Sequence, residues 1–386
     1  MAGRPRALVS VSDKTGVEEL ARGLVALGYE VVSTGNTLRA LAGAGVPATA
    51  VADVTGFPEV LGGRVKSLHP AIHGGVLALR TPEHLAELEA HGITPVDVVV
   101  CNLYPFGATV AREGVTDAEA MEQVDIGGPA MIRAAAKNHA HVTVVVDPAD
   151  YAPVLAELRA GITAARRREL ALKAFAHTAA YDAAIVAYLQ RGQALPRYLG
   201  LPLERAQELR YGENPHQAGA RYRLVGAASV WDDAVLHSGQ ALSYLNVFDA
   251  EAAWRLAHEL PGVACVIVKH ANACGAAVAE DLVTAYERAF DADPKSAFGG
   301  VVALPGRVTL ALAERIAARP KADVVLAHAY EPEALELLAA KRKSTRVISL
   351  AAPGESGVEV RRVDGGFLVQ QPDAVEGRGA WRVVTR

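Results

Sequence analysis

The fold class follows from two consecutive segments, Ala7-Leu8-Val9-Ser10-Val11 and Ser12-Asp13-Lys14-Thr15-Gly16. The first is a short apolar run typical of a buried strand, and the second is polar. Apolar side chains then recur at helical spacing from Val17 to Val25. This pattern predicts a strand, a polar turn and a helix. A helix N-terminus presents unpaired N–H groups and the positive end of the helix dipole, so the turn is a candidate phosphate-binding loop, although ordinary N-capping explains the same residues.

The pattern repeats once and then extends into a sheet. Glu30-Val31-Val32 leads into Ser33-Thr34-Gly35-Asn36-Thr37 and a second helix at 38–44. Two such turns at the same end of adjacent parallel strands face one crevice. Further apolar runs at 48–54, 96–100 and 142–146, separated by helical stretches, predict a parallel sheet of about five strands covered on both faces.

Composition limits the class of protein. The chain has 386 residues, enough for two or three domains, and its net charge of -4 indicates neither a nucleic-acid partner nor a membrane surface. The N-terminus has no apolar signal region, so we expect a cytosolic, soluble protein. The three cysteines form no C-x-x-C pair, which argues against a disulfide framework and a cysteine zinc site.

The segment 62–75 reads GGRVKSLHPAIHGG and has neither helical nor strand periodicity, so we expect a loop. Arg64 supplies a planar fork of donors and Lys66 a movable charge, while the glycines allow the backbone to approach a ligand. An anionic substrate requires these features. The alternative is a solvated basic turn.

Two more segments place polar groups where α/β sheets bind ligands. Asn102 and Tyr104 follow the apolar run at 96–100, just past the carboxyl end of a predicted strand. Asp125-Ile126-Gly127-Gly128-Pro129 precedes a predicted helix that carries Lys137 about two turns along. Asp125 suits helix capping and catalysis about equally well.

The second half of the chain is organised differently. Residues 151–189 are helical in pattern, and His177 and Tyr181 are four apart on one face, a spacing typical of packing. The Gly- and Pro-rich segment 191–203 is the best linker candidate. Beyond it, the buried-strand run 264–268 ends in Lys269-His270, and a helix starts near Leu282. A His beside a Lys at a strand end suits acid/base chemistry, although a lone His is more often structural.

Taken together, these segments closely resemble the bifunctional purine-synthesis family that joins IMP cyclohydrolase to AICAR formyltransferase. The first domain carries the resemblance through Ser10-Val-Ser-Asp-Lys-Thr-Gly16, Thr55-Gly-Phe-Pro-Glu59, Gly63-Arg-Val-Lys-Ser-Leu-His-Pro70, Asn102-Leu-Tyr-Pro-Phe106, Asp125-Ile-Gly-Gly128 and Arg133-Ala-Ala-Ala-Lys-Asn-His139. The second carries it through Arg210-Tyr211, Lys269-His270 and Ser296-Ala-Phe-Gly-Gly300. It implies a methylglyoxal-synthase-like three-layer domain with a parallel sheet, followed by a partial cytidine-deaminase-like α/β domain.

The first domain is thereby expected to close formylated AICAR to IMP with loss of water and without a cofactor. That reaction needs a proton acceptor, a stabiliser for the developing oxyanion and a proton donor for the departing hydroxyl. By resemblance the catalytic group is Lys66, Tyr104, Asp125 and Lys137, with their proton roles left open. The same resemblance implies substrate contacts at Ser12, Lys14, Thr15, Thr34, Gly35, Arg64, Ser67, Asn102, Ile126 and Gly127. Asn36 stands where the family usually has a second Gly, a change that Asn tolerates.

The second domain is expected to formylate AICAR with 10-formyltetrahydrofolate as formyl donor. Lys269 and His270 would assist proton transfer, and the implied substrate contacts are Arg210, Tyr211, Gly299 and Asp323. Zinc deaminases need H-x-E and P-C-x-x-C ligands, which are missing near Cys274, so we predict no metal. Ala273 and Leu245 replace a usual Pro and a usual Asn. Relatives form homodimers, and we expect the same here.

The predicted domains are residues 1–195, the cyclohydrolase, and 200–386, a formyltransferase domain that lacks its C-terminal part, because the family continues beyond the position of Arg386. We expect ring closure from the first domain and, by family, formyl transfer from the second. Three other hypotheses stay open: a cyclohydrolase alone, a methylglyoxal-synthase-like lyase acting on a phosphorylated triose, and a dimeric scaffold that binds nucleotide monophosphates without turnover.

Overall fold

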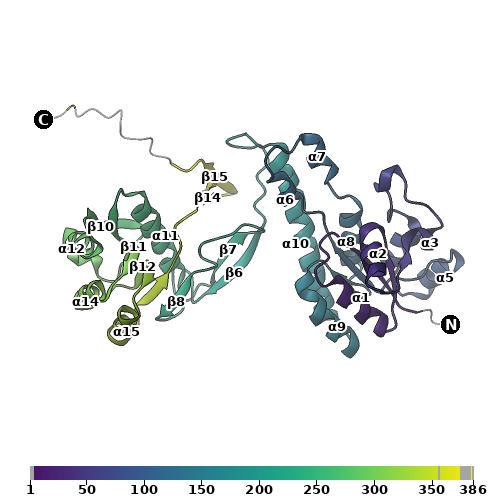
Figure 1. Cartoon of the computed structure of the whole chain (residues 1–386), viewed down its shortest axis with the longest axis horizontal. Helices are drawn as coiled ribbons and strands as arrows, with labels where there is room; N and C mark the ends of the chain where they lie inside the picture. The colour runs from purple at the N-terminus through teal and green to yellow at the C-terminus, as the bar shows by residue number, and fades with distance from the viewer. Residues whose placement is uncertain (1–3, 355–356, 374–383, 385–386) are drawn as a thin grey trace. The chain divides into compact units, whose positions relative to one another are not determined.

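The computed structural model describes residues 4–354, 357–373 and 384, and the chain divides into two compact units, Met1–Pro202 and Leu203–Arg386 (Figure 1). Each unit has its own sheet and its own hydrophobic core. None of the described helices has the length and apolar character needed to span a membrane.

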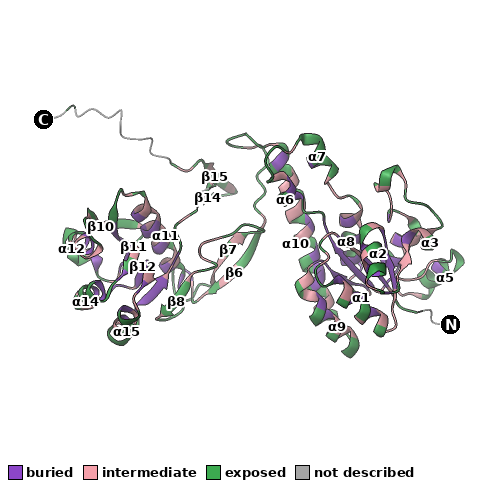
Figure 2. Cartoon of the chain, in the orientation of Figure 1, coloured by how far each residue is buried: buried purple, intermediate pink, exposed green. Residues whose placement is uncertain are grey.

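The first unit is a three-layer α/β structure. Its parallel sheet has the order β3-β2-β1-β4-β5, built from β1 (Arg6–Val11), β2 (Glu30–Ser33), β3 (Thr49–Ala50), β4 (Val98–Asn102) and β5 (Thr143–Val145). The strands are apolar on both faces, and Figure 2 shows them as the buried layer. This confirms the predicted five-stranded parallel sheet.

Helices cover both faces of that sheet, because both faces present apolar side chains, chiefly Val, that must leave water. One face packs against α1 (Val17–Ala26), α2 (Gly35–Gly43) and α9 (Tyr151–Ala160). The other packs against α3 (Val51–Thr55), α4 (Pro70–Leu77), α8 (Gly127–Lys137) and α10 (Ala164–Leu189). Three further helices, α5 (Pro82–Ala90), α6 (Phe106–Val110) and α7 (Asp117–Glu122), lie in the connections.

Two local predictions are wrong. The apolar run 48–54 is a strand only at Thr49–Ala50, since the chain turns into α3 at Val51 and satisfies its backbone groups within the helix. The predicted loop 62–75 ends at His69, because Pro70 occupies the first turn of α4 and the Nδ1 of His69 accepts a hydrogen bond from the N–H of Ala71.

The second unit contains a mixed six-stranded sheet in the order β10-β9-β11-β12-β13-β8. Its strands are β8 (Val235–Ser238), β9 (Val263–Lys269), β10 (Asn272–Ala279), β11 (Val301–Val308), β12 (Val324–Tyr330) and β13 (Arg346–Ser349). On one face lies α11 (Tyr244–Glu259), and on the other lie α12 (Leu282–Ala292), α14 (Leu310–Ala318) and α15 (Pro332–Lys341). The predicted strand ending at Lys269 and helix from Leu282 are confirmed as β9 and α12.

Smaller elements complete this unit. Hairpins form from β6 (Leu203–Leu209) with β7 (Gly219–Leu224) and from β14 (Glu359–Val363) with β15 (Gly366–Gln370). A short helix, α13 (Pro294–Ala297), precedes β11.

Candidate active site

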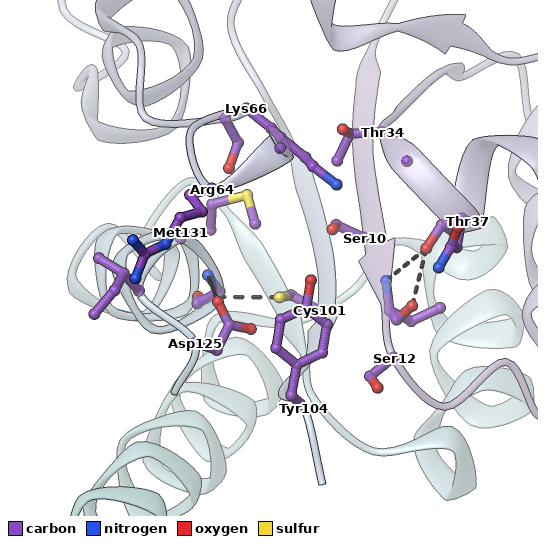
Figure 3. Close-up of a pocket in the computed structure, with 18 of the residues that line it drawn as sticks. Ser10, Ser12, Thr34, Thr37, Arg64, Lys66, Cys101, Tyr104, Asp125 and Met131 are labelled. Carbon is purple, nitrogen blue, oxygen red and sulfur yellow. Dashed lines mark hydrogen bonds between the residues drawn. The ribbon is translucent and has the colours of Figure 1, made fainter. Parts of the chain in front are cut away.

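A cavity of about 490 Å³ opens at the carboxyl ends of β1 and β4, which pair in parallel with Val11 opposite Asn102 (Figure 3). The strand order reverses here, since the chain adds β2 and β3 on one side of β1 and β4 and β5 on the other. Connections leave such a switch point in opposite directions and leave a crevice between them, where open α/β sheets bind ligands. The position of the cavity therefore follows from the strand order of the sheet.

Most of the predicted site residues of this unit line the cavity. They are Ser12, Lys14, Thr34, Gly35, Arg64, Lys66, Ser67, Asn102, Tyr104, Asp125, Ile126 and Gly127. Ser10, Thr37, Cys101 and Met131, which the sequence did not single out, also line it.

Two predicted residues are not among the lining. Thr15 is exposed, and its backbone N–H donates to the carboxylate of Asp13 at 2.9 Å. Lys137 is the exposed last residue of α8. It lies six residues after Met131, which lines the cavity, and thus about 9 Å farther along the helix axis. The family motif links Lys137 to the site, but α8 runs away from the carboxyl edge of the sheet.

Asn102 shapes the first turn of the cavity. Its Oδ1 accepts hydrogen bonds from the N–H groups of Ser12 and Asp13 at 2.6 and 2.9 Å, and its Nδ2 donates to the carbonyl of Asp13 at 3.1 Å. The side chain is buried, so these bonds are shielded from water. The ammonium of Lys14 approaches the carbonyls of Val11 and Ser12 at 3.4 and 3.2 Å. Asn102 thus fixes the loop that carries Ser12 and Lys14.

Lys66 extends into the cavity through space that two glycines leave open. A Cβ at Gly35 would lie 2.9 Å from the Nζ of Lys66, and one at Gly63 would lie 2.7 Å from its Cε. The Nζ is 3.5 Å from Oε2 of Glu59, whose Oε1 accepts a hydrogen bond of 2.7 Å from the hydroxyl of Thr34. Sequence reasoning missed Glu59 as a site residue; its only signal was its place in the Thr55–Glu59 motif.

Asp125 and Tyr104 lie next to each other in the cavity (Figure 3). Burial raises the pKa of the Asp125 carboxyl, and hydrogen bonds from nearby backbone N–H groups oppose that rise. One of these bonds comes from the N–H of Gly128 in the first turn of α8, at 2.8 Å. Burial raises the pKa of Tyr104, and the charge of Asp125 adds to the effect. Asp125 therefore binds the start of α8 and also faces the cavity.

A hydroxyl from α10 holds the segment that carries Asp125. The Tyr181 hydroxyl accepts a hydrogen bond from the N–H of Asp125 at 2.8 Å and donates to the carbonyl of Gln123 at 3.0 Å. Its ring packs edge-on against Phe106, with centroids 6.2 Å apart. Tyr181 thus packs as predicted and, in addition, its hydroxyl holds the Asp125 segment by two hydrogen bonds.

The cavity is suited to a phosphorylated ligand. The first residues of α2 and of α8 line it, so two helix N-termini contribute N–H groups and positive dipole ends. Lys14, Arg64 and Lys66 add three cationic side chains. The carboxyl of Asp125 supplies an acid/base group in the same cavity (Figure 3).

The second unit has a hollow of about 410 Å³ that brings together four predicted residues: Lys269, His270, Gly299 and Asp323. His270 and Ala271 have positive φ of 56° and 59°, a strained turn for non-glycine residues. The carboxylate of Asp249 holds this turn by accepting from their N–H groups at 3.3 and 2.8 Å. Asp249 also lines the hollow. Sequence reasoning did not identify it, because Asp249 lies on α11, twenty-one residues before His270.

Arg210 and Tyr211 are not among the residues that line this hollow. The guanidinium of Arg210 lies over the Tyr211 ring, 5.3 Å from its centroid. Within the described residues no group of three or more His, Cys, Asp or Glu side chains is arranged to enclose a metal ion.

Comparison with known proteins identifies the family. Residues 16–130 match the MGS-like domain model, and residues 135–386 match the model of the AICARFT/IMPCHase bienzyme. A bifunctional purine biosynthesis protein PurH of Deinococcus deserti is 52% identical over 95% of this chain and 73% of its own length. The PurH proteins of Deinococcus radiodurans and Chloroflexus aurantiacus are also 52% identical, over 96% and 99% of this chain and 73% and 74% of their own lengths.

A solved structure titled "Crystal structure of ForH" is 42% identical and covers 47% of this chain and 97% of its own, with a TM-score of 0.44. The two family models and the similarity to a PurH protein over 95% of this chain agree with the resemblance seen in the sequence. The chain therefore belongs to the AICARFT/IMPCHase family of bifunctional purine biosynthesis enzymes, which join an IMP cyclohydrolase to an AICAR formyltransferase.

Proposed function

We propose that the cavity at the switch point of the five-stranded sheet is the IMP cyclohydrolase site of this chain. The observation that carries the proposal is the meeting of Lys66, Tyr104 and Asp125 in one crevice with two helix N-termini. The ligand would be formylated AICAR, a nucleotide monophosphate, and the product IMP.

The phosphate would bind at the end of the cavity formed by the turns after β1 and β2. Ser12 and Thr34 offer hydroxyl donors, Lys14 offers an ammonium group, and the first N–H groups of α2 point outward from the helix start. The N-terminal partial charge of a helix favours an anion there. The base would then extend toward Tyr104 and Asp125 on the β4 side.

Ring closure requires a new C–N bond between the carboxamide nitrogen and the formyl carbon. The carboxamide nitrogen loses one proton as it attacks, and the formyl oxygen becomes a hydroxyl. The C–O bond then breaks and water departs, while the formamide nitrogen loses its proton and forms the C=N bond of the ring. Asp125 is suited to accept the nitrogen's proton, because its raised pKa brings it closer to the working pH than an ordinary carboxylate. Such general base catalysis contributes typically about 10²–10⁴-fold.

The developing charge on the formyl oxygen needs a positive partner. The Lys66 ammonium reaches into the cavity and can stabilise that oxygen; a single donor of this kind is worth roughly 10²–10³-fold. The Tyr104 hydroxyl remains protonated at neutral pH, because its pKa is raised, and can donate to the departing hydroxyl. These steps use only side chains of the chain itself.

In the second unit we propose that the hollow at Lys269 and His270 formylates AICAR with 10-formyltetrahydrofolate as donor. The Lys269 ammonium donates to the carbonyl of Phe298 at 2.8 Å, which fixes it beside the strained turn that presents His270. His270 would take the proton from the attacking amine, with the Lys269 ammonium beside it to stabilise the developing oxyanion, and tetrahydrofolate would leave as the formyl group is transferred. Gly299 and Asp323 would hold the substrate. We also propose that the chain forms a homodimer, which light scattering would test.

The proposal for the first unit is tested by the ultraviolet change on adding formylated AICAR to purified protein. Wild type should form IMP, and Lys66→Ala should lose at least about a hundredfold in kcat/KM. Monophosphate binding without product in wild type would favour the scaffold hypothesis instead. Elimination of phosphate from a triose phosphate would favour the lyase. A parallel assay with AICAR and 10-formyltetrahydrofolate separates the second activity from the first.

A further inference from the structure

Two histidines meet in the second unit, away from both cavities. The Nε2 of His258 on α11 lies 3.2 Å from the Nε2 of His328 on β12, and neither residue lines the hollow. Asp249, the hollow residue nearest to His258 along α11, is nine residues earlier, which is about 14 Å along the helix axis. The pair is therefore separate from the proposed formyl-transfer site.

The other ring nitrogen of each histidine faces a backbone carbonyl. Nδ1 of His258 lies 2.8 Å from the carbonyl oxygen of Trp254, and Nδ1 of His328 lies 3.0 Å from that of Leu350. A carbonyl oxygen can only accept, so both Nδ1 atoms carry the proton in the neutral rings. Both Nε2 atoms then present lone pairs to each other. This arrangement requires a positive species between them.

The spacing fits a metal ion. Metal-binding imidazoles usually donate their second N–H to a carbonyl or carboxylate, as both rings do here. Two nitrogens bound to zinc at about 2.05 Å are about 3.3 Å apart at a tetrahedral angle and about 2.9 Å apart at a right angle. The observed 3.2 Å lies between these values.

We propose that His258 and His328 form a surface binding site for a borderline divalent transition-metal ion of the Zn²⁺, Ni²⁺ and Cu²⁺ class. Imidazole nitrogen suits these ions, whereas Mg²⁺ prefers oxygen ligands. No third His, Cys, Asp or Glu joins the pair within the part of the chain that the structure describes, so water completes the coordination. His328 is exposed and His258 half-buried, which leaves those positions open to solvent.

Trp254 provides a built-in reporter for this site. Its ring centroid lies 4.4 Å from that of His258 and 5.0 Å from that of His328, and the indole is fully buried. Bound Cu²⁺ quenches indole fluorescence at such distances, whereas Zn²⁺ does not. Titration of the full chain without an affinity tag with Cu²⁺ should therefore give saturable quenching, and Zn²⁺ should reverse it by competition while Mg²⁺ should not.

His328→Asn removes the ligand nitrogen but keeps an N–H donor for the Leu350 carbonyl, so the local fold should persist. We expect it to weaken Cu²⁺ binding at least about tenfold, the lower end of the loss seen even for second-shell partners of metal sites. His237→Asn is the matched control, because that exposed imidazole bonds to the Ser349 hydroxyl at 2.7 Å and is not part of the pair. It should bind Cu²⁺ as wild type does.

His258→Asn checks the result from the other ring, with circular dichroism to confirm folding of each variant. The proposal is overturned by equal quenching in wild type and His328→Asn, by an equal loss in His237→Asn, or by no saturable binding. The last outcome would mean that the two rings share only a proton.

Discussion

Tyr181→Phe tests whether the α10 hydroxyl positions the proposed catalytic carboxylate. The substitution removes one oxygen and leaves the N–H of Asp125 and the carbonyl of Gln123 without their partner. An unsatisfied buried polar group costs about 1–3 kcal/mol, and this segment is only half-buried, so we expect a loss of about 1–2 kcal/mol in unfolding free energy. For a unit of this size that corresponds to a Tm roughly 2–8 °C lower.

The effect on catalysis should exceed the effect on stability. An ångström of displacement at a reacting group can cost about a hundredfold, so kcat for ring closure should fall between about tenfold and a hundredfold. The released segment also admits water around Asp125. Because burial is what raises the pKa of that carboxyl, the acid limb of the kcat–pH profile should move to lower pH.

Tyr188→Phe is the matched control. Tyr188 lies on the same helix and packs edge-on against the same Phe106 ring, but its hydroxyl donates to Asp117 at 3.0 Å instead of to the Asp125 segment. It should lower Tm without changing kcat or its pH profile. If Tyr181→Phe behaves in the same way as this control, the positioning role is refuted.

Three further substitutions and two comparison variants test the cavity. Gly35→Ala should lower Tm and reduce ring closure, because the new Cβ would meet the Lys66 ammonium at 2.9 Å. Gly45→Ala should lower Tm alone, because Gly45 also has a positive φ (70°, against 54° at Gly35) but no neighbour within 4 Å. Asp125→Asn should cost about 10²-fold or more in turnover yet leave Tm at pH 7 equal or higher. Its folded pKa is raised, so the ionised carboxylate disfavours folding above that pKa, and the advantage of Asn should vanish in acid, as melting curves across pH would show. Lys66→Ala should lose roughly 10²–10³-fold in ring closure, whereas Lys137→Ala should lose less than about tenfold; a larger loss would contradict a site built within one chain.

Much of the first unit was predictable, because its strands are continuous apolar runs and its helices have clear periodicity. Hydrophobic pattern identifies strands that are buried on both faces, and β1, β2, β4 and β5 are of this kind. The length of the edge strand β3 was not predicted correctly, since a short apolar run is equally typical of the start of a helix. The start of α4 at Pro70 was not predicted, because the cap depends on the geometry of the His69 side chain and not on residue type alone.

The site was predictable where polar residues follow strand ends, because parallel strands deliver those ends to one edge. Supporting residues were not, since they act through contacts that sequence spacing does not encode. Glu59 holds Lys66 from a loop, Asp249 holds the turn at His270 from a helix, and Tyr181 reaches Asp125 across 56 positions. Lys137 lies within a motif shared with the family but is not among the residues that line the cavity, so its part in the reaction stays a prediction.

The most direct test of the central claim is a crystal structure of the chain with IMP bound. We expect the nucleotide in the cavity at the carboxyl ends of β1 and β4, with its phosphate at Ser12, Lys14 and the start of α2 and its base between Lys66, Tyr104 and Asp125. A nucleotide bound elsewhere in this unit, with the cavity at the switch point empty, would contradict it.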